Sequence, residues 1–227
     1  MTTPPLDIVR AYHQRTKHRF DGYAQGPETL DWDDQPAAFR HFAGAPAVTL
    51  PGLAALDAEL AALIARPFGA IASPVPAAPP GMASLAALLQ LALGVTAWKS
   101  YGPSRWAVRA NPSSGNLHPV EAYVVVSGLA GLADGVYHYR PDDHALELRA
   151  EFAPAADAAQ SPHSAHSARS PAIHVALTSI MWREAWKYGE RAFRYCQLDT
   201  GHAVAALAYA AALLGWQMME QIGRAHV

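Results

Sequence analysis

Apolar residues recur every three or four positions along parts of the chain, which is the spacing of one face of an α-helix. Residues 53–64 and 84–93 show this repeat, and Ser84 stands where an N-cap is expected. A short helix is predicted over residues 6–18. A long apolar helix is predicted over residues 198–214, with Gly215 placed to end it.

Other stretches are typical of β-strands, because they are short, apolar and bounded by turn residues. The predicted strands cover residues 120–126, 135–139, 146–148 and 172–178. The second and third flank Pro141-Asp142-Asp143 and predict a β-hairpin. The succession of helices, strand, hairpin, strand and helix predicts an α+β domain, in which helices cover a central mixed or antiparallel sheet.

The remaining segments lack a clear period. Residues 22–51 are rich in Pro, Gly, Asp and aromatic side chains, which predicts an extended, packed arm. Residues 67–80 contain five prolines and predict a surface loop. Residues 151–171 are a low-complexity run of Ala, Ser and His, which predicts a flexible excursion.

Composition narrows the class of protein. The chain has 227 residues, of which 51% are hydrophobic and 16% charged, so it supports a substantial core. A formal net charge of -2 disfavours nucleic acids and anionic membranes as partners. Cys196 is the single cysteine, which excludes an internal disulfide and fits a reducing, cytoplasmic location. We expect no secretion signal, and the apolar run 203–216 is too short to span a bilayer.

The segment 109–119 is the strongest candidate for chemistry. It reads Arg-Ala-Asn-Pro-Ser-Ser-Gly-Asn-Leu-His-Pro and directly precedes a predicted strand. Backbone N–H groups, hydroxyls and amides gathered in one loop can hold a phosphate or the edge of a flat heterocycle. A capped turn that merely feeds the strand explains the same composition equally well.

Two further segments combine cations with polar or aromatic groups. Residues 13–19 alternate basic and hydroxyl side chains, which suits a phosphate, although a solvated basic turn is the better reading of this segment by itself. Residues 182–195 interleave cations and aromatics, and Lys187 beside Tyr188 is a candidate acid/base pair whose pKa values neighbouring cations would lower. The alternative is an exposed helix face with a Glu190–Arg194 pair. The sequence contains no recognised metal-ligand spacing, phosphate-binding P-loop or GxGxxG motif.

Together, these segments resemble the nitroreductase superfamily, especially its SagB/ThcOx-type dehydrogenases. The resemblance rests on three stretches in the family's order: residues 15–18 (RTKH), 112–121 (PSSGNLHPVE) and 186–191 (WKYGER), the last running into 198–202 (LDTGH). It implies a nitroreductase-like α+β fold that binds FMN, as a homodimer or as two fused halves.

The resemblance also implies roles for individual residues. Lys187 and Tyr188 match a pair that acts on the substrate in azoline dehydrogenases. Reduced flavin is negatively charged near N1, so Arg191 and neighbouring cations would stabilise it. The implied FMN contacts are Arg15, Thr16 and Lys17, towards the phosphate and ribityl chain, and Ser113, Ser114, Gly115, Asn116 and Arg191.

The sequence departs from the family pattern at both ends. The first motif commonly has arginine, serine and a further basic residue at alternate positions, where this chain has Gln14, Thr16 and His18. The family also continues beyond the long helix into another strand and a basic segment, so we expect a domain over residues 1–221 that is incomplete at its C-terminus. Residues 222–227 can be encoded by the start of a common sequencing adapter, and we interpret them as a non-native tail.

Three functions follow as hypotheses. The leading one is an FMN-dependent dehydrogenase that oxidises azolines of a peptide or small-molecule substrate to azoles. The second is an NAD(P)H-dependent nitro- or quinone reductase. The third is a non-catalytic half that completes a fused nitroreductase pseudo-dimer.

Overall fold

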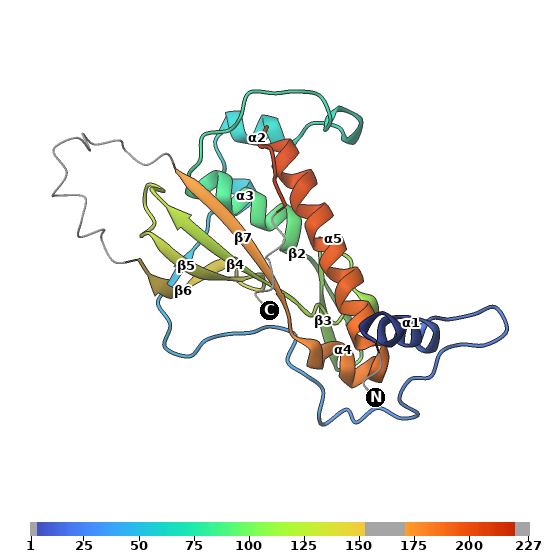
Figure 1. Cartoon of the computed structure of the whole chain (residues 1–227). Helices are drawn as coiled ribbons and strands as arrows, with labels where there is room; N and C mark the ends of the chain where they lie inside the picture. The colour runs from blue at the N-terminus through green and yellow to red at the C-terminus, as the bar shows by residue number, and fades with distance from the viewer. Residues whose placement is uncertain (1–3, 153–170, 221–227) are drawn as a thin grey trace.

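The computed structural model describes residues 4–152 and 171–220, in which a five-stranded sheet is the central element (Figure 1). The strands are β1 (Ala47–Thr49), β4 (Val120–Ser127), β5 (Gly135–Arg140), β6 (Ala145–Glu151) and β7 (Ala172–Ser179). They lie in the order β1-β6-β5-β4-β7, and every neighbouring pair is antiparallel. The predicted strands and the β5–β6 hairpin are confirmed.

The helices are α1 (Pro5–Thr16), α2 (Ala58–Ile64), α3 (Met82–Leu93), α4 (Met181–Tyr188) and α5 (Ala192–Leu213). Short 3-10 turns are η1 (Leu53–Ala55), η2 (Phe68–Ala70), η3 (Ser114–Asn116) and η4 (Gly189–Arg191). The helix expected over 53–64 is therefore a 3-10 turn followed by a shorter helix, and α5 begins six residues earlier than expected. Gly215 ends α5 at a φ of 68°, as predicted.

Ser84 is not the N-cap of α3. Gly81 occupies that position, and Ser84 lies three residues inside the helix. The Ser84 hydroxyl accepts from the Gly81 N–H at 2.9 Å and donates to the Pro79 carbonyl at 2.8 Å. The serine thus satisfies a free N–H of the helix start from within the first turn, which is the second half of a capping box.

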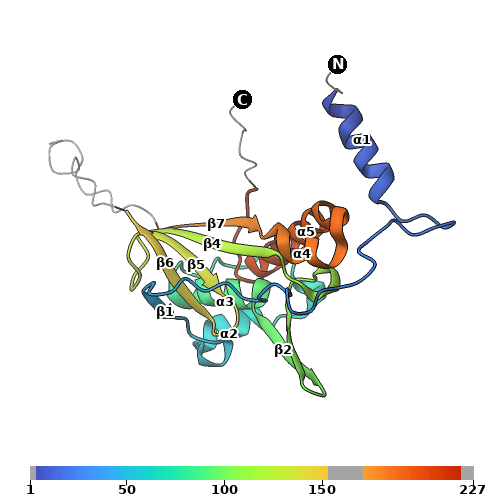
Figure 2. The ribbon, with the colours of Figure 1, turned by 90° about the horizontal axis from the view of Figure 1, so that it is seen from below.

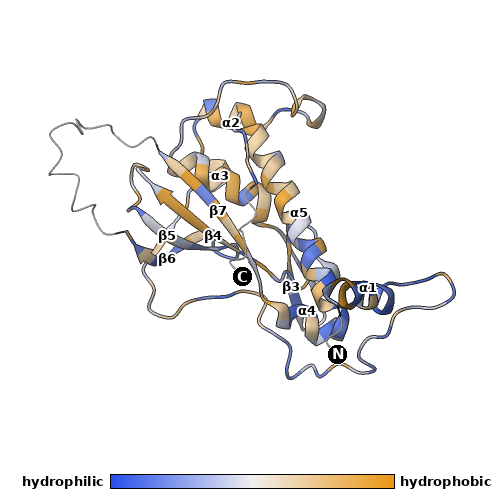
Figure 3. Ribbon diagram, viewed as in Figure 1, coloured by the Kyte–Doolittle hydropathy of each residue, from blue (hydrophilic) through white to orange (hydrophobic). Residues whose placement is uncertain are grey.

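The two faces of the sheet differ in chemistry because side chains alternate along each strand. Val120, Ala122, Val124 and Val126 of β4 face α3 and α5 and form part of the main apolar core. Figure 3 shows apolar residues along β4 and α3 and along the C-terminal half of α5. Glu121, between the first two, is buried on the opposite face. One face therefore carries the core, and the other accepts buried polar groups.

Extended chain from the N-terminal arm covers the polar face. The predicted arm, 22–51, contains no helix, and its only strand is β1. Three backbone carbonyls of the arm accept hydrogen bonds from side chains of the domain. The donors are Trp186 to the Asp31 carbonyl, Arg183 to the Ala37 carbonyl and Arg109 to the Ala38 carbonyl.

Helix α1 projects from the rest of the molecule, as Figure 2 shows. Its N-terminal turns leave Leu6, Ile8 and Val9 exposed.

The hairpin formed by β2 (Val95–Tyr101) and β3 (Ser104–Arg109) was not predicted from the sequence. Residues 153–170, with His163 and His166, and the tail 222–227 lie outside the described residues. Within the described ranges, no helix is both long and apolar enough to span a membrane.

Candidate functional site

One buried carboxylate holds the loop that precedes β4. Asp199 lies in α5 and is fully buried. The Ser113 hydroxyl donates to Asp199 Oδ2 at 2.6 Å, and the Ser114 backbone N–H donates to Oδ1 at 3.1 Å. The Ser114 hydroxyl lies 3.2 Å from the same Oδ1. Asp199 therefore fixes the loop, and both serine hydroxyls already have protein partners.

Gly115 brings this loop against the Lys187–Tyr188 pair. Its φ of 63° is in the left-handed region that favours glycine. A Cβ at this position would lie 2.5 Å from the Tyr188 hydroxyl oxygen and 3.0 Å from Lys187 Nζ. Any larger residue here would have to displace the ends of these two side chains. Two of the three stretches on which the resemblance rests therefore meet here.

A second buried carboxyl group, that of Glu184, lies one helical turn before this pair on α4. Glu184 is fully buried, and neither of its oxygens has a hydrogen-bond partner among the described residues. Burial, followed by the negative charge of Asp199, raises the pKa of Glu184 to about 8. At neutral pH Glu184 is therefore mostly protonated, which avoids two buried negative charges side by side.

The pKa of Tyr188 is raised, not lowered by neighbouring cations as the sequence analysis expected. Burial, and then the carboxyl group of Glu184, raise the pKa of Tyr188, and the guanidinium of Arg191 offsets only part of this rise. The expectation is wrong for this residue because it neglected the loss of water and the acidic neighbour. The Tyr188 hydroxyl is consequently a hydrogen-bond donor at neutral pH.

Arg191 extends the positive charge of the site. Its guanidinium carbon lies 5.4 Å from the Tyr188 ring centre and 5.0 Å from that of Tyr195. The residue is 9% exposed, and its Nε has no partner in the described part of the chain. A buried guanidinium N–H without an acceptor is a suitable place for an anionic group of a ligand.

The N-terminal corner docks beside the same helices, but its polar groups are occupied. Arg15 forms an ion pair with Glu190. The Thr16 hydroxyl donates to the Tyr12 carbonyl at 2.8 Å and accepts from Arg194 Nε at 3.2 Å. A phosphate at this corner would have to compete with these partners.

Lys17 and Asn116 complete the predicted set. Lys17 caps the end of α1, where its backbone N–H donates to the His13 carbonyl. The Asn116 amide donates to the Ala107 carbonyl at 2.7 Å, and its oxygen lies 3.0 Å from His118 Nε2. Asn116 thus contacts the β2–β3 hairpin, away from the Lys187–Tyr188 pair.

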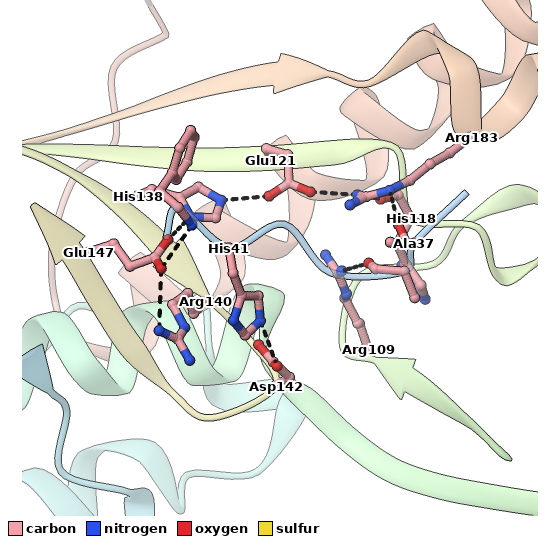
Figure 4. A network of polar contacts seen from close by, with 12 residues as sticks. Ala37, His41, Arg109, His118, Glu121, His138, Arg140, Asp142, Glu147 and Arg183 are labelled. Carbon is pink, nitrogen blue, oxygen red and sulfur yellow. Dashed lines mark hydrogen bonds and ion pairs between the residues drawn. The ribbon is translucent and has the colours of Figure 1, made fainter. Parts of the chain in front are cut away.

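Sequence reasoning missed a buried ionic network on the polar face of the sheet (Figure 4). Glu121, His138 and Glu147 come from β4, β5 and β6, and His138 lies between the two carboxylates, at 2.6 and 3.0 Å. Arg183 of α4 pairs with Glu121, and Arg140 pairs with Glu147. The network ties α4, which carries the Lys187–Tyr188 pair, to three strands.

Partners within this network stabilise its charged forms. Burial alone would raise the pKa of Glu121, but the hydrogen bond from His138 and the charge of Arg183 outweigh it and lower the pKa. The pKa of Glu147 is lowered in the same way, with help from the Phe42 N–H of the arm. The network therefore contains carboxylates that stay ionised.

Comparison with known proteins identifies the family. The family model described as nitroreductase matches residues 78–223, which is more than half of the chain. The chain belongs to the nitroreductase family. Both the resemblance and the α+β architecture are thereby confirmed.

Individual relatives match parts of longer proteins. The chain is 34% identical over 117 residues to the trifolitoxin-processing protein TfxB of Rhizobium leguminosarum, covering 49% of this chain and 31% of TfxB. It is 28% identical over 104 residues to the nitroreductase-like protein MJ1384 of Methanocaldococcus jannaschii, covering 46% of this chain and 52% of that protein. A crystal structure of a nitroreductase-like protein of Anabaena variabilis superposes with a TM-score of 0.62 at 28% identity, covering 90% of this chain and 38% of the other. The chain thus spans about a third to a half of the length of these relatives.

Proposed function

We propose that this domain is an FMN-dependent dehydrogenase whose Lys187–Tyr188 pair acts on an azoline ring of a peptide substrate. The approach of Gly115 to both side chains is the observation that carries this proposal. The partial similarity to a peptide-toxin-processing protein supports a peptide substrate.

The described residues fit a flavin at the Gly115 loop better than at the N-terminal corner. The orphaned Arg191 Nε supplies positive charge, and Lys187 supplies an amine, beside a loop that no Cβ crowds. By contrast, Arg15 and Thr16 are bound to Glu190 and Arg194. We therefore assign Gly115, Lys187 and Arg191 to the isoalloxazine, and of the N-terminal residues we keep only Lys17 as a phosphate contact.

Oxidation of an azoline to an azole removes two hydrogens from adjacent ring carbons, one as a hydride and one as a proton. Bound FMN would supply the hydride acceptor. Tyr188 stays protonated at neutral pH, so the base in this proposal is Lys187, whose amine accepts the proton in its neutral form and becomes an ammonium. The Tyr188 hydroxyl donates a hydrogen bond to the substrate and orients the ring. Glu184 is mostly uncharged at neutral pH, so it leaves the positive charge of this site unopposed from its side.

The proposal predicts a flavoprotein that loses azoline oxidation when Lys187 is replaced. The full-length protein is purified, reconstituted with FMN and assayed with a thiazoline-containing peptide. Lys187→Ala should retain flavin and lose oxidation, whereas Lys99→Ala, an exposed lysine of the β2–β3 hairpin, should retain both. A Lys187→Ala enzyme as active as the wild type would contradict the assignment.

A general NAD(P)H-dependent nitro- or quinone reductase is the alternative within the same family. It predicts that NADH-driven reduction of nitroaromatics is rapid and unaffected by Lys187→Ala. Azoline oxidation would then be absent in the wild type as well.

A non-catalytic half is favoured by one specific observation, the occupied Arg15 and Thr16. In that case the domain completes a pseudo-dimer with a second nitroreductase half, which binds the flavin. A full-length protein that stays colourless after FMN reconstitution would support this alternative and exclude both enzymes.

A further inference from the structure

A cavity of about 290 Å³ lies beside Asn116, and neither Lys187 nor Tyr188 lines it. It is lined by the β2–β3 hairpin, by the arm at residues 35–39 and by residues 116–118 and Arg183. The side chains that define its chemistry are Phe39, Trp98, Trp106, Arg105, Arg109 and Arg183. None of the residues that line it is acidic. Its wall is therefore aromatic and cationic.

Arg109 is the group that indicates a missing anion. The residue is 7% exposed, and within the described ranges its side chain makes one hydrogen bond, from Nη2 to the Ala38 carbonyl at 2.9 Å. Its Nε has no partner, and no carboxylate lies within ion-pair distance, among the residues that the structure describes. Burial lowers the pKa of Arg109 to about 10, so the guanidinium is still charged at neutral pH. Glu121 and Asp142 act on this charge only from beyond ion-pair distance. A buried charge without a direct ion-pair partner is costly, and a bound anion would reduce that cost.

Two other arginines line the cavity: Arg183 is neutralised by an ion pair, and Arg105 is available to bind a ligand. Arg183 is already paired with Glu121. Arg105, on the exposed β3 strand, has no carboxylate partner in the described ranges, and its guanidinium carbon lies 4.3 Å from the Trp98 ring centre. His118 adds no charge, because burial and the nearby Arg109 lower its pKa to about 3. The cavity therefore offers Arg109 at its floor and Arg105 at its rim.

The aromatic side chains restrict the shape of the ligand. Trp98 and Trp106 remain 44% and 39% exposed, although both are large apolar residues on a short hairpin. The Phe39 ring lies 5.9 Å from that of Trp98, and the Arg109 guanidinium lies 5.0 Å from Phe39. A flat ring inserted here would cover exposed indole surface and place a substituent near the guanidinium groups.

We propose that this cavity binds a planar aromatic carboxylate, stacked on Trp98 and ion-paired with Arg109 and Arg105. The site does not include Gly115, Lys187 or Tyr188. The proposal is thus independent of the reaction assigned to that pair.

Calorimetric titration of the FMN-saturated full-length protein tests this site. Naphthoate is the probe, naphthamide its neutral counterpart, and cyclohexanecarboxylate an anion without a flat ring. We expect naphthoate to bind roughly tenfold or more tightly than either, because charge-assisted hydrogen bonds and ring stacking both contribute. Equal binding of naphthoate and naphthamide, or no binding of naphthoate, would overturn the proposal.

Variants locate the bound probe. Arg105→Gln, at an exposed position, and Trp98→Leu should each weaken naphthoate binding roughly tenfold, and Arg109→Gln should weaken it more. Lys99→Gln, the neighbouring exposed cation on β2, is the matched control and should bind like the wild type. Binding that survives Arg105→Gln and Trp98→Leu but is lost in Lys187→Ala, or that free FMN displaces, would place the probe at the flavin site and refute a separate cavity.

Discussion

The Tyr188 hydroxyl oxygen lies 2.5 Å from the point that a Cβ of Gly115 would occupy. This relationship joins the loop before β4 to the end of α4, two segments that are far apart in the sequence. Two requirements explain why position 115 is a glycine: the backbone has a left-handed φ, and there is little room for a side chain.

Gly115→Ala should impair both stability and flavin binding. The alanine has to adopt a left-handed conformation, which costs about 1–2 kcal/mol, and its methyl group would displace Tyr188 and Lys187. Urea unfolding and FMN titration measure the two effects.

Gly102→Ala is the matched control for this substitution, because Gly102 has a φ of 56° and a Cβ added there would meet no atom within 4 Å. It carries the same conformational cost without the displacement. We expect Gly115→Ala to be destabilised by about 1 kcal/mol or more beyond Gly102→Ala, as overpacking usually requires. Equal losses in the two variants would contradict the close approach.

Asp199→Asn should loosen the Gly115 loop, because an amide accepts through only one of its two terminal atoms. The Ser113 hydroxyl and the Ser114 N–H would compete for that one acceptor. We expect a loss of roughly 1–3 kcal/mol in the free energy of unfolding. Thr200→Val, on the same helix, is the control, since its hydroxyl donates to the Cys196 carbonyl within the helix and has only a long contact, 3.4 Å, with the Ser179 hydroxyl. Ser113→Ala and the double variant complete a double-mutant cycle. If the losses in the free energy of unfolding are additive, the Ser113–Asp199 hydrogen bond contributes nothing to stability.

The elements of the core could be predicted from the sequence because their patterns are local. The runs that became β4 and β7, and the Gly that ends α5, follow from apolar periodicity and backbone propensity. The β2–β3 hairpin escaped notice because its strands are largely exposed and carry cations between the aromatics. Such strands have no clean alternation of apolar and polar residues.

The polar partners could not be predicted because they depend on strand register. His138 meets Glu147 because β5 and β6 pair at those positions, and His138 also lies opposite Tyr123, two residues from Glu121. One signal was available for Asp199, since it is the single acidic residue in the largely apolar stretch 198–214. A lone carboxylate in a helix of that kind indicates a buried partner.

Stability should depend on pH through Glu184. The folded-state pKa is raised to about 8, whereas the unfolded value is the ordinary 4.5. The protonated form is therefore favoured by folding, so its contribution is complete below pH 4.5 and is lost as pH rises towards about 8. Across that window the slope approaches about 1.4 kcal/mol per pH unit for one proton.

Glu184→Gln tests this linkage by removing the titrating group while keeping a neutral side chain of similar size. Urea unfolding of the variant should lose less stability than the wild type between about pH 5 and pH 8, on the order of 1 kcal/mol per unit. Parallel profiles for the two proteins would show that Glu184 is not held protonated.

The buried Arg183–Glu121 pair should matter far more than the exposed Arg15–Glu190 pair. Arg183→Met leaves Glu121 buried with one partner fewer, which we expect to cost about 3–5 kcal/mol. Arg15→Met should change the free energy of unfolding far less, because its ion pair is solvated. Chemical denaturation of both variants measures the contrast, and comparable losses would mean that the network on the polar face of the sheet is not formed as described.

The central claim is that Lys187, beside Gly115, takes a proton from the substrate as the flavin is reduced. Anaerobic addition of a thiazoline peptide to the FMN-loaded full-length protein tests it most directly, with the visible flavin absorbance followed in time. The wild type should bleach, and Lys187→Ala should keep its flavin and remain oxidised. Bleaching of Lys187→Ala at the wild-type rate would contradict the claim.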